Sequence, residues 1–158
     1  MGLSGGLLSL AFTGFAVIAY FKGLTALAAF CATVVGAVLA YTWFNVYPAR
    51  FFMGATGSAA VGATLGVVAL LTNSVLILPI IGLLFVVEAG SSVIQVFSKK
   101  VFGRKVFRAA PIHHHFQAVG WPESKVVARF WIIGAAAMAL GLVLGLIGAG
   151  TSTRLPGI

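Results

Sequence analysis

One polar stretch, residues 98–125, lies between apolar runs that are long enough to cross a membrane. It holds six of the ten Lys and Arg residues, all three histidines and one of the two acids. Because unpaired polar groups are costly in hydrocarbon, this stretch must lie in water or in a water-filled site. We therefore expect any polar ligand or chemistry to be found here, first at His113, His114 and His115.

The composition excludes a soluble domain. The chain has 158 residues, of which 61% are hydrophobic and only 8% are charged. A soluble fold has to cover itself with polar groups, and this chain has too few of them. We expect one all-α integral membrane domain over residues 1–158. The net charge of +8 then indicates basic residues that face anionic lipid or an anionic substrate, and we expect no nucleic-acid partner.

The apolar runs predict about five transmembrane helices. They cover residues 7–21, 24–44, 59–71, 74–97 and 126–147. Two polar loops, residues 45–58 and 98–125, connect them on one side. The second loop carries most of the basic residues, so the positive-inside rule predicts that both loops are cytoplasmic. The expected location is the bacterial inner membrane, with several spans.

The fourth predicted span has a polar face. Glu88, Ser91, Ser92 and Gln95 recur at helical spacing, so they share one side of a helix. We expect that side to face other helices or a wet cavity instead of lipid. Glu88 is either a functional group within a span or a hydrogen-bonded packing group, and the pattern leaves both readings open.

Three stretches on the predicted cytoplasmic side are candidates for one composite site: LSGGLLSLA, FFMGATGS and PIHHHF. In a loop after Pro111, two histidines can converge on a phosphate or a metal, or all three can cap backbone groups. In FFMGATGS, backbone N–H groups can face a ligand and Phe51 or Phe52 can stack on a base. The alternative for that stretch is an ordinary turn between helices.

The same stretches resemble the MraY family, the phospho-N-acetylmuramoyl-pentapeptide transferases. FNVYPARFFMGATGSAAVGATLG is similar to the family's FNxxPAxxFMGDxGSLALGxxLG. FVVEAGSSVIQVFSKKVFGRKVFRAAPIHHH resembles the segment that follows, and PIHHHFQAVGWPESKVVARFWII resembles the terminal cytoplasmic loop and last helix. The resemblance covers about Ala40 to Leu146, and LSGGLLSLA can be laid on the family's TDGLDGLA.

The resemblance implies the C-terminal half of a ten-helix transferase. The family moves phospho-MurNAc-pentapeptide from its UDP carrier to undecaprenyl phosphate, giving lipid I and UMP with Mg²⁺. It implies catalytic roles for His113, His114 and His115 and ligand contacts for a further set of residues. That set is Asn45, Gln95 and Phe52, the last at the place where the family stacks uracil. Two more residues belong to the predicted substrate-binding site: Gly54 beside the base and Arg108 near the phosphates.

The departures from the family pattern concern the metal. The family's Asp in MGDxGS is Ala55 here, and the two Asp of TDGLDGLA fall on Gly5 and Leu8. Mg²⁺ prefers oxygen ligands, and imidazoles replace them poorly. We therefore expect that this chain alone binds no Mg²⁺, although the family uses it.

Two functions from different classes follow. The first is an MraY-type transferase half that is inactive alone and retains weak affinity for undecaprenyl phosphate and uridine nucleotides. The second is a non-catalytic membrane scaffold derived from the family; a small transporter, suggested only by Glu88 and the interrupted fourth span, is less favoured. In either case we expect the lipid bilayer as environment, and as partner a second copy or a complementary N-terminal half.

Overall fold

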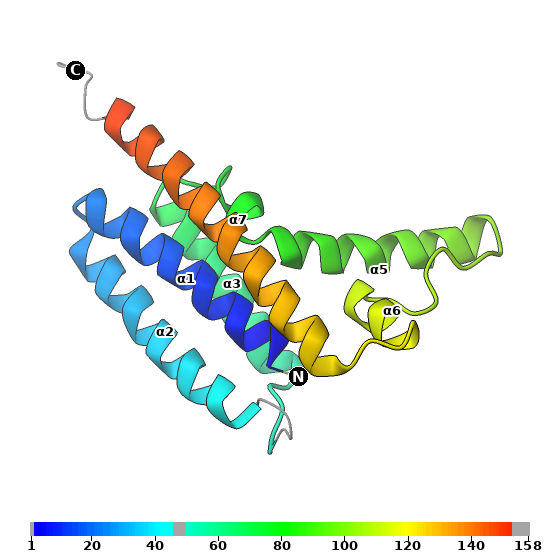
Figure 1. Cartoon of the computed structure of the whole chain (residues 1–158). Helices are drawn as coiled ribbons and strands as arrows, with labels where there is room; N and C mark the ends of the chain where they lie inside the picture. The colour runs from blue at the N-terminus through cyan, green and yellow to red at the C-terminus, as the bar shows by residue number, and fades with distance from the viewer. Residues whose placement is uncertain (1, 46–49, 153–158) are drawn as a thin grey trace.

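The computed structural model describes residues 2–45 and 50–152, and every regular element in these ranges is a helix (Figure 1). Residues 46–49 of the predicted loop 45–58 lie outside the described part. The helices are α1 (Leu3–Phe21), α2 (Thr25–Asn45), α3 (Ala55–Leu71), α4 (Leu78–Ile81), α5 (Leu83–Val101), α6 (Ile112–Ala118) and α7 (Glu123–Ser152). The all-α membrane class expected from the composition is thus confirmed.

α1 is the helix around which the others pack. Eleven of its nineteen residues are buried, and Phe12, Phe15 and Ile18 are fully enclosed. α2 lies along one side of α1 and α7 along the other (Figure 1). Because α1 is apolar on all sides, it suits the centre of a bundle, whereas a surface helix of a soluble protein would keep one polar face.

Glycines let the neighbouring helices approach closely. A Cβ on Gly6 would lie 2.2 Å from the Trp131 indole, and a Cβ on Gly141 would lie 2.5 Å from the Ile81 side chain. Small residues at such crossings are the usual device for helix packing in membranes, where no hydrophobic effect drives helices together. α7 can therefore lie against both α1 and α4.

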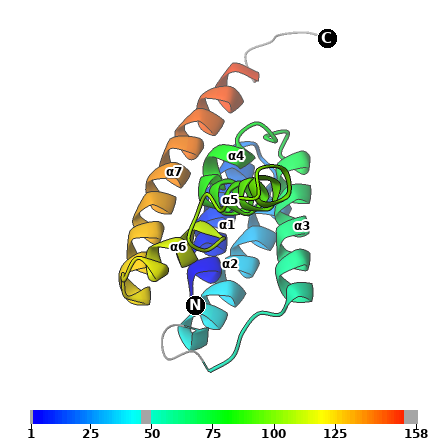
Figure 2. The ribbon, with the colours of Figure 1, turned by 90° about the vertical axis from the view of Figure 1, so that its right-hand side faces the viewer.

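Three helices meet the length and hydropathy needed to cross a membrane, namely α1, α2 and residues Glu123–Gly150 of α7. Ala55–Leu71 is a shorter apolar helix and begins four residues before the predicted start at residue 59. α1 begins and α7 ends at opposite ends of the bundle (Figures 1 and 2). The described part of the chain is thus a membrane protein with several spans.

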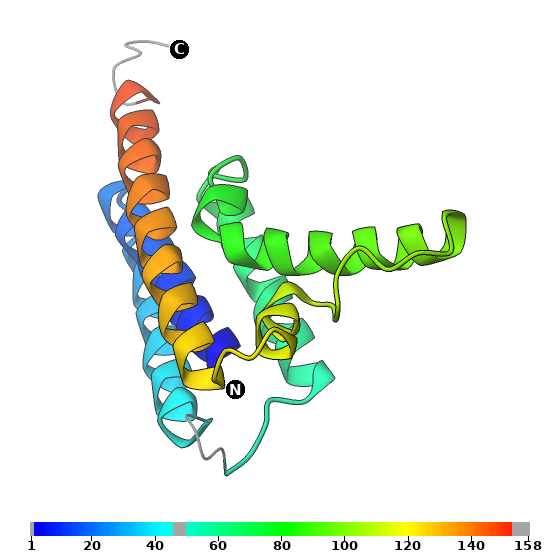
Figure 3. The ribbon, with the colours of Figure 1, turned by 45° about the vertical axis from the view of Figure 1, so that its right-hand side comes forward.

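The predicted continuous span 74–97 is divided instead into α4 and α5 at Gly82. Pro79 lies in the first turn of α4, and Gly82 both ends α4 and precedes α5. A Cβ on Gly82 would lie 3.0 Å from the Leu78 carbonyl oxygen, so a residue without a side chain suits this bend. After the break α5 runs away from α7 and out of the bundle (Figure 3).

Candidate functional site

The three candidate stretches lie at the same end of the molecule. The start of α1, residues 50–54 before α3, and α6 are all found where α7 begins (Figure 3). The sequence indicated this common side through topology alone. The structure brings the stretches to one end because α1 and α3 both start there and α6 immediately precedes α7.

The histidines were expected in a loop, and the structure has them in a helix instead. They occupy the first turns of α6, which begins directly after Pro111. A proline suits this place because a helix start needs no backbone N–H donor there. Since consecutive residues of a helix point in different directions, the three imidazoles cannot converge on one ligand.

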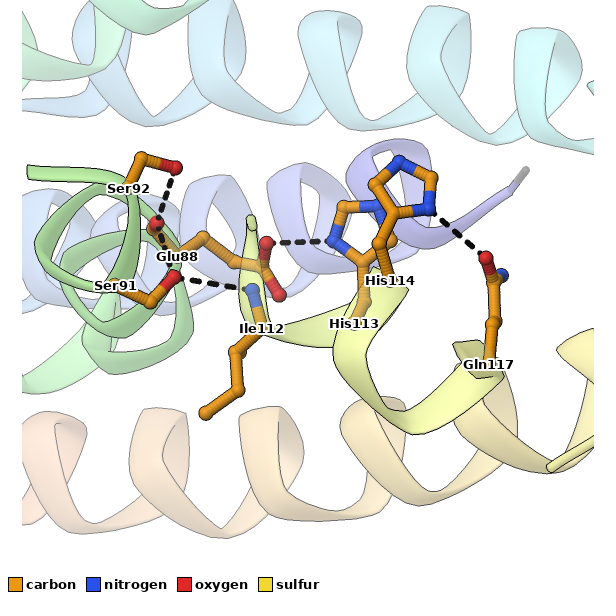
Figure 4. A network of polar contacts seen from close by, with 7 residues as sticks. All are labelled: Glu88, Ser91, Ser92, Ile112, His113, His114 and Gln117. Atoms are coloured by element: carbon orange, nitrogen blue, oxygen red, sulfur yellow. Dashed lines mark hydrogen bonds and ion pairs between the residues drawn. The ribbon is translucent and has the colours of Figure 1, made fainter. Parts of the chain in front are cut away.

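Each histidine has a different partner through Nδ1. The Nδ1 of His113 lies 2.6 Å from Glu88 Oε2, and the Nδ1 of His114 lies 2.9 Å from Gln117 Oε1 (Figure 4). The His115 Nδ1 accepts a hydrogen bond of 3.1 Å from the backbone N–H of Arg108. His115 therefore braces the preceding segment, while the rings of His113 and His114 lie together with centroids 4.1 Å apart.

The predicted polar face of α5 exists, and the chain's own segment 104–113 covers it. Ser98 Oγ donates to the Arg104 carbonyl, and Ser91 Oγ accepts from the Ile112 N–H. Between them, Gln95 Oε1 accepts from the N–H groups of Val106 and Phe107, and its Nε2 donates to the Phe107 carbonyl. We call this antiparallel series of contacts, including Glu88 with His113, the polar ladder.

The polar ladder changes two expectations. Gln95, predicted as a substrate contact, uses both atoms of its amide to hold residues 106 and 107. Apart from Glu88 Oε1, which has no partner among the described residues, the polar face is satisfied by the chain's own segment and gives little reason for a second copy or a partner half. Arg108, another predicted contact, keeps an exposed side chain while its backbone is tied to His115.

The remaining predicted contacts lie around the end of α2. Asn45 is buried, and its side chain joins the Gly2 N–H to the Phe51 carbonyl. Phe51 packs near Tyr41 and Phe44, with centroids 5.5 and 6.0 Å apart. Phe52 is instead 63% exposed, and Gly54 beside it has open space where a Cβ would stand. Phe52 is thus free to stack on a planar ligand, whereas Asn45 and Phe51 organise the loop.

The three residues that the resemblance laid on the family's Asp positions do not fit a metal ion. None of Gly5, Leu8 and Ala55 has a side-chain oxygen, and a Cβ on Gly5 would lie 2.2 Å from the Thr42 hydroxyl. Leu8 is buried in the apolar core. Within the described residues there is no group of three His, Cys, Asp or Glu side chains suited to a metal. Two of the three positions thus serve helix packing.

An apolar groove of about 580 Å³ opens between α1, α3 and the α4–α5 bend. Its walls include Leu8, Leu65 and Phe85, and its hydroxyl-bearing residues are Ser4 and Ser58. Both serines belong to the first turns of their helices, so they lie at the end of the groove where α1 and α3 begin. Neither serine was predicted as a site residue, although each falls within a candidate stretch.

A second missed feature joins α6 to α7. The Trp121 ring stacks on Phe116 with centroids 5.1 Å apart. The guanidinium of Arg129 lies 4.4 Å from the Trp121 ring centre and the ammonium of Lys125 lies 5.0 Å from it. Cations over an indole face are attracted by the ring electrons. The spacing of Trp121, Lys125 and Arg129 by four residues was the available signal.

Comparison with known proteins gives consistent matches. Residues 2–73 match the model of the family described as Glycosyl transferase family 4. The phospho-N-acetylmuramoyl-pentapeptide-transferase of Pelagibacter ubique is 47% identical over 134 residues, which are 85% of this chain and 37% of that protein. The same-named proteins of Rubrobacter xylanophilus and Geobacillus kaustophilus are 46% and 47% identical over 90% of this chain, and over 43% and 44% of their own lengths. The chain spans less than half the length of the relatives it matches.

Proposed function

The chain belongs to the family of phospho-N-acetylmuramoyl-pentapeptide transferases, and on that premise we propose that it forms the C-terminal, lipid- and nucleotide-facing part of such an enzyme. The proposed reaction transfers phospho-MurNAc-pentapeptide from UDP to undecaprenyl phosphate and gives lipid I and UMP. The observation that carries the proposal is the apolar groove between α1, α3 and the α4–α5 bend, whose two serines belong to the first turns of α1 and α3.

The groove suits a prenyl phosphate. A prenyl chain needs an apolar channel within the membrane, and Leu65, Leu78 and Phe85 supply such walls. A phosphate needs hydrogen-bond donors, and the two serines of the lining, Ser4 and Ser58, lie at one end only. The Ser58 hydroxyl donates to the Gly54 carbonyl at 3.1 Å, so it would have to turn to meet a phosphate. This one-sided polarity orients the lipid with its phosphate toward the end where α1 and α3 begin.

A uridine nucleotide is the second ligand of the proposal. The exposed ring of Phe52 offers a stacking surface, worth about 1–3 kcal/mol per base. The imidazoles of α6 and the guanidinium of Arg108 are donors for phosphate oxygens. Because Gly5, Leu8 and Ala55 offer no oxygen ligands for Mg²⁺, no step of the reaction is assigned to a metal on this chain.

We propose that the chain alone makes no lipid I. Charge neutralisation is the main requirement of phosphoryl transfer, and the carboxylates that would hold the metal must come from a complementary N-terminal half. The alternative is a non-catalytic scaffold, which is favoured by the use of Gly5 and Leu8 for helix packing. In both cases the partner would meet the exposed small residues of α3: Ala59, Ala60, Gly62 and Ala63.

The orientation belongs to the same proposal. Positive-inside topology puts loops 45–58 and 98–125 on the cytoplasmic side of the bacterial inner membrane. A Gly103→Cys variant in intact cells should react with a membrane-impermeant maleimide only after permeabilisation. Equal labelling of intact cells would reverse the orientation.

A groove-filling substitution tests the lipid site. Gly62 lines the groove, and a Cβ placed on it would meet no other atom within 4 Å, so Gly62→Trp should fill the groove without a clash. Native mass spectrometry should detect undecaprenyl phosphate on the unaltered chain and much less on Gly62→Trp. Gly36→Trp, at an equally open position on α2, is the matched control. Equal retention by both variants would remove the groove from the proposal.

A lipid I assay separates the two functions. The chain should be inactive alone and active only with the N-terminal half of a matched relative, and Ala55→Asp should raise that activity while Ala55→Asn should not. Metal-dependent lipid I synthesis by the chain alone would refute the proposed inactivity. Stable pairing of the halves with no turnover in any combination would favour the scaffold.

A further inference from the structure

Glu88 and His113 form a close pair between α5 and α6. The Oε2–Nδ1 distance is 2.6 Å, and the two side chains are 15% and 24% exposed. Glu88 is one of only two acidic residues in the chain, and it comes from a helix whose large exposed side chains before Lys99 are apolar. An ionisable group within an apolar helix is a functional hypothesis by default.

The backbone next to the pair is held by a separate contact. Ser91 Oγ accepts the Ile112 N–H at 3.0 Å and donates to the Glu88 carbonyl (Figure 4). The start of α6 is thus attached to α5 without the Glu88 carboxylate. The carboxylate is therefore available to orient the imidazole of His113, one residue further along.

The carboxylate is also under-satisfied. Glu88 Oε1 is buried and has no hydrogen-bond partner among the described residues. A group kept only for packing would normally have its acceptors satisfied, so a buried orphan of this kind calls for a functional explanation. In the described structure, the His113 ring nitrogen is the one partner of the Glu88 carboxylate.

We propose that Glu88 is the positioning residue of the histidine site. An ionised carboxylate only accepts hydrogen bonds, so Nδ1 of His113 carries the proton and Nε2 is left as the ring's free nitrogen. No described residue bonds Nε2. Glu88 therefore holds both the ring orientation and the tautomer, and it leaves Nε2 to take the proton of a monoprotonated phosphate. The imidazolium formed in this way donates from Nε2 to the phosphate and from Nδ1 to Glu88; this last part rests on the proposed nucleotide function.

The tautomer of His113 tests the proposal directly. The full chain, labelled with ¹⁵N-histidine and reconstituted in phosphatidylcholine nanodiscs, should give a His113 signal of the Nδ1–H form, assigned with His113→Gln. Glu88→Met is similar in length but has no carboxylate to accept the hydrogen bond from Nδ1–H, and it should return His113 to a mixture of tautomers. Ser92→Ala is the matched control, because its hydroxyl bonds only the Glu88 carbonyl within α5.

Nucleotide binding supplies the second readout. Millimolar UMP should shift Nε2 of His113 in the unaltered chain and in Ser92→Ala, and Glu88→Met should weaken UMP binding about three- to tenfold. A His113 tautomer that does not depend on residue 88 would overturn the proposal. So would UMP binding that is sensitive to Phe52→Ala and leaves His113 unshifted, and in that case the proposed nucleotide function stands. No response of any residue to UMP, with tautomer control by Glu88 intact, would leave the positioning role and refute the nucleotide ligand.

Discussion

The bundle of α1, α2, α4 and α7 differs from the arm formed by α5, residues 102–111 and α6 in how it is held together. In the bundle, side chains such as Phe12 and Ile18 are fully buried and glycines allow close helix contact. In the arm, α5 turns apolar side chains such as Ile94 and Phe97 outward and its polar side chains inward, against the segment that follows it.

The difference follows from what each region has to satisfy. In each helix of the bundle, the backbone N–H and C=O groups are hydrogen-bonded to each other, so neighbouring helices need only complementary side-chain surfaces. Residues 102–111 form no helix or strand, and their N–H and C=O groups need partners from elsewhere. Gln95 and Ser98 provide those partners for residues 104, 106 and 107. Polar side chains on a largely apolar helix such as α5 can therefore be explained by the irregular segment they support.

The largest effect is expected from breaking the close packing of the bundle. In Gly141→Val, the new Cβ would meet the Ile81 side chain at 2.5 Å and its backbone nitrogen at 3.2 Å. Overpacking of this kind costs about 1–3 kcal/mol, so the folded fraction after heating in detergent should fall. Gly36→Val, at an open position on α2, is the control and should unfold like the unaltered chain. Equal stability of both variants would show that α4 and α7 can separate freely.

A local effect of similar size is expected from the polar ladder. Gln95→Ala removes three hydrogen bonds to Val106 and Phe107, which lowers the free energy of opening the segment by about 1–3 kcal/mol. Limited trypsin digestion after Arg104 and Lys105 should become faster, while the unfolding temperature of the bundle stays nearly constant. Val96→Ala, at the exposed neighbour, should leave digestion unchanged. A global loss of stability would mean that arm and bundle are one cooperative unit.

The smallest effect is expected from Ser98→Ala. It removes one hydrogen bond of 2.9 Å to the Arg104 carbonyl, worth about 0.5–1.5 kcal/mol. Trypsin should cleave this variant faster than the unaltered chain and more slowly than Gln95→Ala. In the double variant, the loss in the free energy of opening the segment should be smaller than the sum of the two single losses, because both contacts hold the same segment. Strict additivity would show that residues 104 and 106–107 open independently.

Helical periodicity predicted the polar face of α5 correctly, and the common side of the candidate stretches could be predicted from the order of the spans. The break at Gly82 could not, since Pro79 and Gly82 are both tolerated within membrane helices when neighbours satisfy the backbone. The helical state of the histidines was also missed. A seven-residue helix has little intrinsic stability, and α6 depends on the contact of Phe116 with Trp121 and of the Ile112 N–H with Ser91.

The sequence by itself determined the class of this protein, because 61% hydrophobic residues in runs of membrane length permit no water-exposed fold. It also determined which side chains share the polar face, because helical geometry sets that spacing locally. Only the tertiary structure decided the partners: Gln95 supports the chain's own loop, Thr42 fills the space beside Gly5, and Glu88 meets His113. Such pairings join residues far apart in the chain and depend on the direction that α5 takes after Gly82, which no local pattern specifies.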